Sequence, residues 1–555
     1  MLFISRDAIL NVVKQKDILS AFPSNHTPRA QQAAVLKKIE KFLRGDKKFL
    51  ILCAPTGSGK SYISRTVANL TDSCSKDFKH LVDSYSIYQM DQSGEFSNQE
   101  EIDKQQPFGS MVLTISKNLQ NQYKEFFDDS DILKGKSNYQ CTIDETKDVE
   151  IAPCVVVGKI KDDCWKKCIC PYYEARNRVV TSNFGILNYS MFLALPDQLK
   201  RKELLICDEA AELEDELVKR FGFDISYERL AQLGIHTQKL ATDVPNRVIE
   251  WLTNLLCVIE EQIKILTEKR NKKELSDAQQ NKLRGLNNVV HSVKTVTGHW
   301  NDCKYVIEKS ATAVNFSPLK VDKLSSHIFN HGEKIILMSA TIIDPVNFAK
   351  SLGIEEYEYV EMPSSFDPKK APIFVHTKYK LNHANLEQNL PHVCNIAKEL
   401  VDKYKNDKGI IHTHSFKITE YVKAKFDDYG DRMLYRQSGK TNEDIVKEHV
   451  ESDKPTVLVS PSLTHGVDLK DELARFQIVL KLPYLPLGSK RVETLFKLDP
   501  EWYENKMLSS LVQACGRGIR TEEDHCDTYI LDGAIKFVLM KCKDKLPQYF
   551  IQRFQ

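Results

Sequence analysis

The segment "APTGSGKS" (54–61) restricts the fold of this chain more than any other stretch of its sequence. It follows the apolar run "FLILC" (49–53) and precedes the helical run "SYISRTVANL" (61–70). Glycines between a strand and a helix allow backbone N–H groups to surround phosphate oxygens at the start of the helix. Lys60 is expected to reach the β- and γ-phosphates, and the Ser61 hydroxyl is expected to bind Mg²⁺. The segment predicts an ATP site in an α/β domain, with the remaining loop contacts made by Thr56, Gly57, Ser58 and Gly59.

Short apolar runs along the chain are typical of buried strands in parallel sheets. They occupy residues 49–53, 204–207, 335–338, 409–413, 456–460, 476–482 and 528–532. Helical stretches such as 29–43 separate many of them, and this alternation predicts two α/β domains. Residues 226–300 differ, because apolar side chains recur there at steps of three and four, which predicts a helical insertion. The repeating positions are Val248, Leu252, Leu255, Ile259, Ile263 and Leu266, and then Leu283, Leu286, Val290 and Val293.

Two acidic residues follow a second apolar run, in "LLICDEAA" (204–211). Asp208 is expected to bind Mg²⁺ through water, and Glu209 is expected to orient or deprotonate the attacking water. An isolated Asp–Glu pair is more often a surface feature. Its position after a buried strand, downstream of a phosphate loop, favours the catalytic role.

The motif "QACGRGIR" (513–520) contains two arginines that would share one face of a helix. Paired guanidinium groups suit the charge that develops on a transferred phosphoryl group. Alone, they would be interpreted as surface arginines. Because a phosphate loop is present, we predict that Arg517 and Arg520, with Gln513 of the same motif, are catalytic residues supplied by the second domain.

Five of the fourteen cysteines fall within residues 141–170. The segment "DDCWKKCICPYYEAR" (162–176) alone contains three of them, surrounded by charged side chains. In a reducing compartment, clustered cysteines bind metal more often than they form disulfides. Spacing alone leaves open whether the metal centre is a Cys₄ zinc site or an iron–sulfur cluster.

The bulk composition adds little about function. Lys and Arg number 78 and Asp and Glu 76, so the formal net charge of +2 neither indicates nor excludes a nucleic-acid partner. The N-terminus lacks the apolar core of a signal peptide, and no window resembles a membrane span. We therefore expect a cytoplasmic protein that does not contact a membrane.

Several motifs together resemble those of superfamily 2 helicases: "APTGSGKS", "DEAA", "MSATI" (338–342), "THGVDL" (464–469) and "QACGRGIR". The stretches "KGKSNYQC" (134–141), "CPYYEAR" (170–176) and "ILNYSMFL" (186–193) narrow the resemblance to the XPD/DinG family of iron–sulfur DNA helicases. The chain is closer to the DinG type, without a nuclease domain. By this resemblance a 4Fe–4S cluster is ligated by Cys141, Cys154, Cys164 and Cys170, and Cys168 is a spare thiol that could exchange with Cys164.

The resemblance also implies the domain organisation. The expected fold is α/β, with two RecA-like motor domains, an inserted iron–sulfur domain and an inserted helical arch. Motor domain 1 would comprise residues 1–130, 176–212 and 326–365. The iron–sulfur domain would comprise 131–175, the arch 213–325 and motor domain 2 366–555.

Further site residues follow from the family's motifs. Arg29 and Gln32 are expected at the nucleotide base, and Gly466 and Asp468 where ATP is sensed. Ser339 and Thr341 are expected to couple nucleotide state to domain motion. Candidate DNA contacts are Thr114, Tyr189 and Thr413, for each of which a packing role is the alternative.

The chain departs from the family at two positions. Ala211 stands where "DEAH" has His, and His465 stands where Glu is usual. Asp208 and Glu209 remain, so ATP hydrolysis is expected. The missing His normally assists the coupling of hydrolysis to movement along the DNA strand, so this coupling is uncertain from the sequence.

The predicted function is an ATP-dependent, Mg²⁺-requiring helicase that moves 5′ to 3′ on single-stranded DNA and unwinds duplexes in repair, recombination or replication. One alternative is a single-strand translocase that remodels R-loops or protein–DNA complexes without processive unwinding. Another is a nucleic-acid-binding adaptor with a degenerate motor. The expected partners are single-stranded and forked DNA, with a single-strand-binding protein as a candidate, and the expected state is a monomer.

Overall fold

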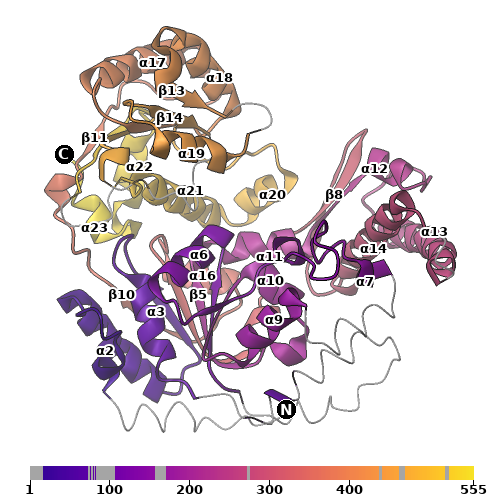
Figure 1. Ribbon diagram of the computed structural model, residues 1–555. Helices are drawn as coiled ribbons and strands as arrows, with labels where there is room; N and C mark the ends of the chain where they lie inside the picture. The colour runs from indigo at the N-terminus through magenta and orange to yellow at the C-terminus, as the bar shows by residue number, and fades with distance from the viewer. Residues whose placement is uncertain are drawn as a thin grey trace.

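The computed structural model describes residues 17–72, 76, 79–80, 82, 107–156, 170–271, 275–436, 440–461, 469, 471–518 and 524–555. Figure 1 shows an N-terminal lobe below, a C-terminal lobe above, and an arm that projects to the right with the helices α12, α13 and α14. No helix in these residues has the length and apolarity needed to cross a membrane.

The N-terminal lobe is built on a seven-stranded sheet in which every strand pair is parallel. In spatial order the strands are β10 (Tyr357–Glu361), β1 (Phe49–Cys53), β9 (Gly332–Ser339), β5 (Lys202–Asp208), β2 (Ser110–Thr114), β4 (Phe184–Asn188) and β3 (Asp131–Ile132). Because β1, β9 and β5 are neighbours, the loops after Cys53, Ser339 and Asp208 lie together at the carboxyl edge of the sheet.

The C-terminal lobe contains a second sheet, six-stranded and again parallel at every pair. Its order is β11 (Ile373–Val375), β16 (Asp527–Ile530), β15 (Phe476–Val479), β12 (Gly409–His412), β14 (Val457–Ser460) and β13 (Met433–Tyr435). The prediction of two α/β units with parallel sheets is confirmed, and each of the seven apolar runs contributes a strand.

The segment between β5 and β9 forms the arm and its base. Helices α13 (Pro245–Asn271) and α14 (Asp277–Gly298) pack together through the apolar positions predicted from helical spacing. The segment also contains an antiparallel sheet of β6 (Phe223–Ser226), β8 (Ala313–Pro318) and β7 (Tyr305–Lys309), which helical spacing did not indicate. In β8 the side chains of Val314 and Phe316 are buried while those between them are partly exposed, the period-two pattern of a half-buried strand.

Candidate nucleotide site between the two lobes

The phosphate loop joins β1 to α3 (Lys60–Ala68), as predicted. Gly57 and Gly59 have φ angles of 74° and 80°, in the left-handed region that glycine adopts at least cost. A Cβ on Gly59 would also collide with the amide group of Gln32. The backbone conformation thus favours glycine at 59, and a side chain there would displace the Gln32 amide from its place beside the loop.

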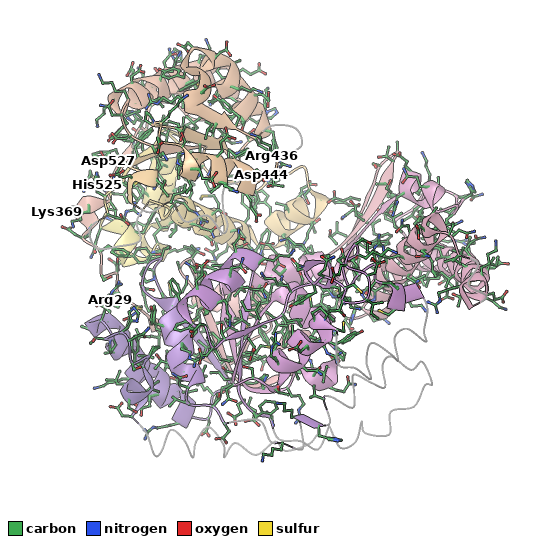
Figure 2. The ribbon with its side chains drawn as sticks, in the orientation of Figure 1. Arg29, Lys369, Arg436, Asp444, His525 and Asp527 are labelled. Atoms are coloured by element: carbon green, nitrogen blue, oxygen red, sulfur yellow. The ribbon has the colours of Figure 1, made fainter. Side chains whose placement is uncertain are left out.

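Arg29 and Gln32 lie at the start of α2 (Ala30–Arg44) and bind the phosphate loop from outside. The Arg29 guanidinium donates to the Gly57 carbonyl at 3.1 Å, and the Gln32 amide donates to the Ser58 carbonyl at 3.0 Å. The side-chain oxygen of Gln32 accepts the Arg29 backbone N–H at 2.9 Å. Figure 2 shows Arg29 at the edge of the N-terminal lobe that faces the C-terminal lobe. The structure thus brings both residues to the loop.

Lys60 and Glu209 form an ion pair across the carboxyl edge of the sheet. The Lys60 Nζ lies 2.9 Å from Glu209 Oε1, and the Ser339 hydroxyl donates to Glu209 Oε2 at 3.2 Å. Burial acts to raise the pKa of Glu209, but Lys60, Arg517 and Ser339 together hold it below its usual value. Glu209 has a φ of 51°, a strained conformation for a residue with a side chain. The carboxylate is therefore ionised and held at a fixed place beside Lys60.

Asp208 is buried at the end of β5 and is bound by a tyrosine that the sequence did not single out. Tyr123, on α6 (Lys117–Phe126), donates its hydroxyl to Asp208 Oδ2 at 3.1 Å, and the Ser61 hydroxyl interacts with the same Tyr123 oxygen. Burial raises the pKa of Asp208 to about 6. The two predicted Mg²⁺ ligands, Ser61 and Asp208, therefore meet at Tyr123.

The motif after β9 lies between the site and the C-terminal lobe. The hydroxyl groups of Ser339 and Thr341 are 3.3 Å apart. The carbonyl of Ala340, between them, accepts the hydroxyl of Tyr549 at 2.7 Å, and Tyr549 belongs to α23 (Gln548–Ile551) of the other lobe. Ser339 thus contacts Glu209 while its neighbour contacts the C-terminal lobe.

The C-terminal lobe reaches the phosphate loop through the end of α21 (Pro500–Cys515). A Cβ placed on Gly516 would lie 3.5 Å from the Thr56 hydroxyl oxygen. Arg517 lies in the turn after α21, so the prediction that it stands on a helix is wrong. It is buried, and its charge is one of the causes that lower the pKa of Glu209. Gln513 lies in the last turn of α21, where its carbonyl accepts the Gly516 N–H at 3.2 Å. Residues from both lobes therefore meet beside Lys60.

Three predicted residues of this site, Arg520, Gly466 and Asp468, lie outside the described residues.

The three candidate DNA contacts are fully buried. Thr114 donates its hydroxyl to the Ser116 carbonyl at 3.2 Å, and the hydroxyls of Thr413 and Thr419 are 2.6 Å apart. Tyr189 donates its hydroxyl to the Asp208 carbonyl at 3.0 Å, so its ring packs beneath the nucleotide site. These placements favour the packing roles that were the alternative interpretation.

An exposed aromatic residue near Thr413 was missed. Phe416 is 70% exposed at the start of α18 (Phe416–Lys425), just beyond the carboxyl end of β12. An aromatic ring that is accessible beside a parallel sheet's carboxyl edge offers a stacking surface for a base. Its signal in the sequence was an aromatic side chain directly after "HTHS".

Three of the four predicted cluster ligands are described, and they lie near the tyrosines of α9 (Pro171–Thr181). Cys141 and Cys170 are buried and Cys154 is half-buried. Burial raises the pKa of Tyr173 to about 12, and Cys170 and Cys154 contribute in the same direction, so both thiols lie close to that ring. The rings of Tyr139 and Tyr172, close in sequence to Cys141 and Cys170, are in edge contact at 5.7 Å.

Thiolates are ligands for zinc and for iron–sulfur clusters, but the predicted ligand set is incomplete in the residues described. Within them no group of three or more His, Cys, Asp or Glu side chains is arranged to hold a metal ion. Cys164 and Cys168 lie outside those residues.

Comparison with known proteins agrees with this architecture. Residues 398–552 match the family described as a helicase C-terminal domain. No curated protein matches the chain significantly.

Three solved XPD structures share the fold over nearly the whole chain. An apo XPD structure has a TM-score of 0.59 at 14% identity and covers 97% of this chain and 98% of its own. An XPD helicase structure has 0.56 at 16% identity, covering 93% and 98%. The Xpd4 structure of S. tokodaii has 0.54 at 14% identity, covering 95% and 99%. The chain therefore has the fold of the XPD structures, with a helicase-type domain in its C-terminal lobe.

Proposed function

We propose that this protein is an ATP-dependent helicase that moves 5′ to 3′ on single-stranded DNA and unwinds duplexes in repair, recombination or replication. The main support is the meeting of Lys60 and Glu209 of one lobe with Arg517 of the other. If the lobes move apart, Arg517 moves away from Lys60 and Glu209 and the site is no longer complete. ATP hydrolysis and relative movement of the lobes therefore depend on each other.

Each residue of the site has a role in this proposal. Lys60 and the loop amides would bind the phosphates. Ser61 and Asp208 would hold Mg²⁺, which when bound would neutralise charge on the phosphates. Glu209 orients and deprotonates the attacking water. Arg517, with Arg520 and Gln513, stabilises the transferred phosphoryl group from the opposite lobe.

The strand would pass between the motor lobes and the arm, with the iron–sulfur domain at residues 131–175 and the arch at 213–325. Phe416 is proposed to stack a base at the carboxyl edge of the C-terminal sheet, because its ring is exposed. Three buried side chains would act by packing below the surface that contacts the DNA, without touching it: Thr114, Tyr189 and Thr413.

The direct test is an unwinding assay on duplexes that carry either a 5′ or a 3′ single-stranded overhang. We expect ATP-dependent unwinding of the 5′-overhang duplex alone, with ATPase activity stimulated by single strands. Lys60→Ala should abolish ATP turnover while leaving strand binding largely intact, because Lys60 contacts phosphate and not the strand. Unwinding only from a 3′ overhang would contradict the polarity, and full turnover by Lys60→Ala would contradict the ATP site.

A single-strand translocase without processive unwinding is the second candidate. One observation favours it: Ala211 lines a cavity of about 50 Å³ between the lobes, where both side-chain polar atoms of Asn505 are buried without a hydrogen-bond partner. The region directly after Glu209 is thus incompletely packed against the other lobe. Unwinding of long duplexes would distinguish the two activities.

We also propose that Cys141, Cys154, Cys164 and Cys170 hold a 4Fe–4S cluster. When bound, the cluster would crosslink four positions between residues 141 and 170. Protein purified without oxygen is expected to be brown, with broad absorbance near about 400 nm, whereas zinc would leave it colourless. Cys141→Ser should lower the iron content, and Cys257→Ser, at an exposed cysteine of α13, should not. A colourless protein that contains zinc would contradict the proposal.

A further inference from the structure

A buried carboxylate in the N-terminal lobe is bound entirely by side chains of the C-terminal lobe. Glu214 lies on α11 (Leu213–Phe221), the helix that follows the Asp208–Glu209 pair, and is 6% exposed. Its Oε1 lies 2.8 Å from Arg491 Nη2, and its Oε2 accepts the Trp502 indole N–H at 2.9 Å and lies 3.3 Å from Lys506 Nζ. The three donors belong to α20 (Lys490–Leu498) and α21.

Two further contacts complete this group, which we call the Glu214 cluster (Glu214, Asp215, Arg491, Trp502 and Lys506). Lys506 Nζ lies 3.0 Å from Asp215, and Arg491 Nε donates to the Pro318 carbonyl of β8 at 2.8 Å. Two cations thus face two carboxylates. The Glu214 and Arg491 side chains are buried, whereas the Asp215 side chain is 42% exposed. Loss of one partner of a buried ion pair leaves the other charge uncompensated. The cluster therefore fixes α21 against the N-terminal lobe in one position.

The same helix leads to the proposed catalytic arginine, which lies in the turn after its last residue, Cys515. Trp502 and Lys506 lie one helical turn apart in its N-terminal half, and its C-terminal end leads directly to Gly516 and Arg517 at the phosphate loop. Because an α-helix is stiff over this length, fixing one end sets the position of the other. Glu209 and Glu214 thus face opposite ends of one helix.

Asn505 lies between Trp502 and Lys506 and faces the cavity beside Ala211, which Glu214, Trp502 and Lys506 also line. Neither of its amide atoms has a hydrogen-bond partner among the described residues.

Other interlobe contacts include the Tyr549 hydroxyl with the Ala340 carbonyl and Glu308 of β7, whose Oε1 accepts the Lys490 backbone N–H at 2.7 Å at the start of α20. Trp502 and Tyr503 also pack against Val306 and Leu319 of the N-terminal lobe. Among the ion pairs of the described residues, those of Lys506 with Glu214 and Asp215 are the ones that join a charged side chain of α21 to the N-terminal lobe.

We infer that Glu214 is a positioning residue: through α21 it holds Arg517 at the nucleotide site, so that turnover depends on a carboxylate that does not touch ATP. The inference rests on the proposed function for its effect on turnover. The anchoring of the lobes does not depend on that function and is measurable by itself.

The test is a double-mutant cycle between Glu214→Gln and Arg517→Lys. We expect Glu214→Gln to lower kcat for ATP by about 10²-fold, the cost of a small misplacement of a catalytic group, with KM changed less than about twofold. In the Arg517→Lys background the same change should have a much smaller effect, because both act through residue 517. The matched control is Glu504→Gln on the same helix, where the carboxylate pairs with Lys541 and Lys545 inside the C-terminal lobe. It should leave kcat unchanged.

A second measurement follows the lobes directly. Spin labels at Lys38 on α2 and Lys447 on α19 (Asn442–Glu451), both exposed, should show a broader distance distribution in Glu214→Gln than in Glu504→Gln. If Glu214→Gln does not fold, Arg491→Lys replaces it in both experiments, since lysine keeps the charge but loses the paired contacts to Glu214 and Pro318.

Unchanged turnover in Glu214→Gln, or an equal loss of kcat in the wild-type and Arg517→Lys backgrounds, would overturn the inference. If the wild-type protein hydrolyses no ATP, the proposed function fails. In that case an unaltered distance distribution in Glu214→Gln would separately show that the Glu214 cluster does not anchor the lobes.

Discussion

Replacement of Arg517 by alanine is expected to lower kcat for ATP about 10³–10⁵-fold, the effect of removing an arginine that stabilises the transferred phosphoryl group. The reason lies in its position: Arg517 is buried beside Glu209 and follows Gly516, whose backbone approaches Thr56. ATP binding should change far less, because the phosphate loop belongs to the other lobe. Steady-state turnover with single-stranded DNA and equilibrium binding of a fluorescent ATP analogue measure the two properties.

Arg44→Ala is the control for this experiment. Arg44 lies at the end of α2 and pairs with Glu40 at 2.6 Å on the surface, so its loss should leave turnover unchanged. A kcat for Arg517→Ala within a few-fold of the wild type would show that the C-terminal lobe does not contribute a catalytic arginine.

Glu209→Gln is expected to give the second large loss, about 10²–10⁴-fold in the rate of ATP cleavage, because glutamine cannot accept the proton of the attacking water. Glutamine has nearly the same shape and still accepts the Ser339 hydroxyl, so folding and ATP binding should be retained. The substitution also removes the ion pair between Lys60 and residue 209, so that this carboxylate no longer competes with phosphate for the lysine. Rapid-quench measurement of a single turnover separates cleavage from product release.

For Glu209→Gln the control is Glu250→Gln, at an exposed carboxylate that pairs with Arg247 in the arm. It should cleave ATP at the wild-type rate. An unaltered single-turnover rate for Glu209→Gln would contradict the assignment of the base and point to another carboxylate.

Much of the fold could be predicted because its central strands are continuous apolar runs. β1 and β5 are buried almost throughout, so "FLILC" and "LLIC" could be recognised without knowledge of their partners. β2 and β4 are almost as buried, although they were not predicted as strands from the sequence. Thr114 at the end of β2 and Tyr189 directly after β4 were considered as DNA contacts. The sheet of β6, β8 and β7 was not predicted, because β6 and β8 are not continuous apolar runs: alternate residues of β8 and one residue of β6 are buried.

The candidate site was predictable where its residues follow strands of one sheet. Lys60 and Glu209 are 149 positions apart in the sequence. Both follow strands of the same parallel sheet, so their meeting at its carboxyl edge could be predicted. Tyr123 could not be foreseen, since a tyrosine on an amphipathic helix has no pattern that distinguishes packing from binding to Asp208. The pairing of Glu214 with Arg491, 277 positions apart, depends on how the two lobes dock, which no local pattern encodes.

The most direct measurement is a crystal structure of the full chain with Mg²⁺ and a non-hydrolysable ATP analogue. We expect one analogue between the lobes, with Lys60 and the Arg517 guanidinium both in contact with its γ-phosphate and Glu209 facing that phosphate. An analogue held by the N-terminal lobe alone, with Arg517 directed away from it, would contradict the claim that the two lobes share one hydrolytic site.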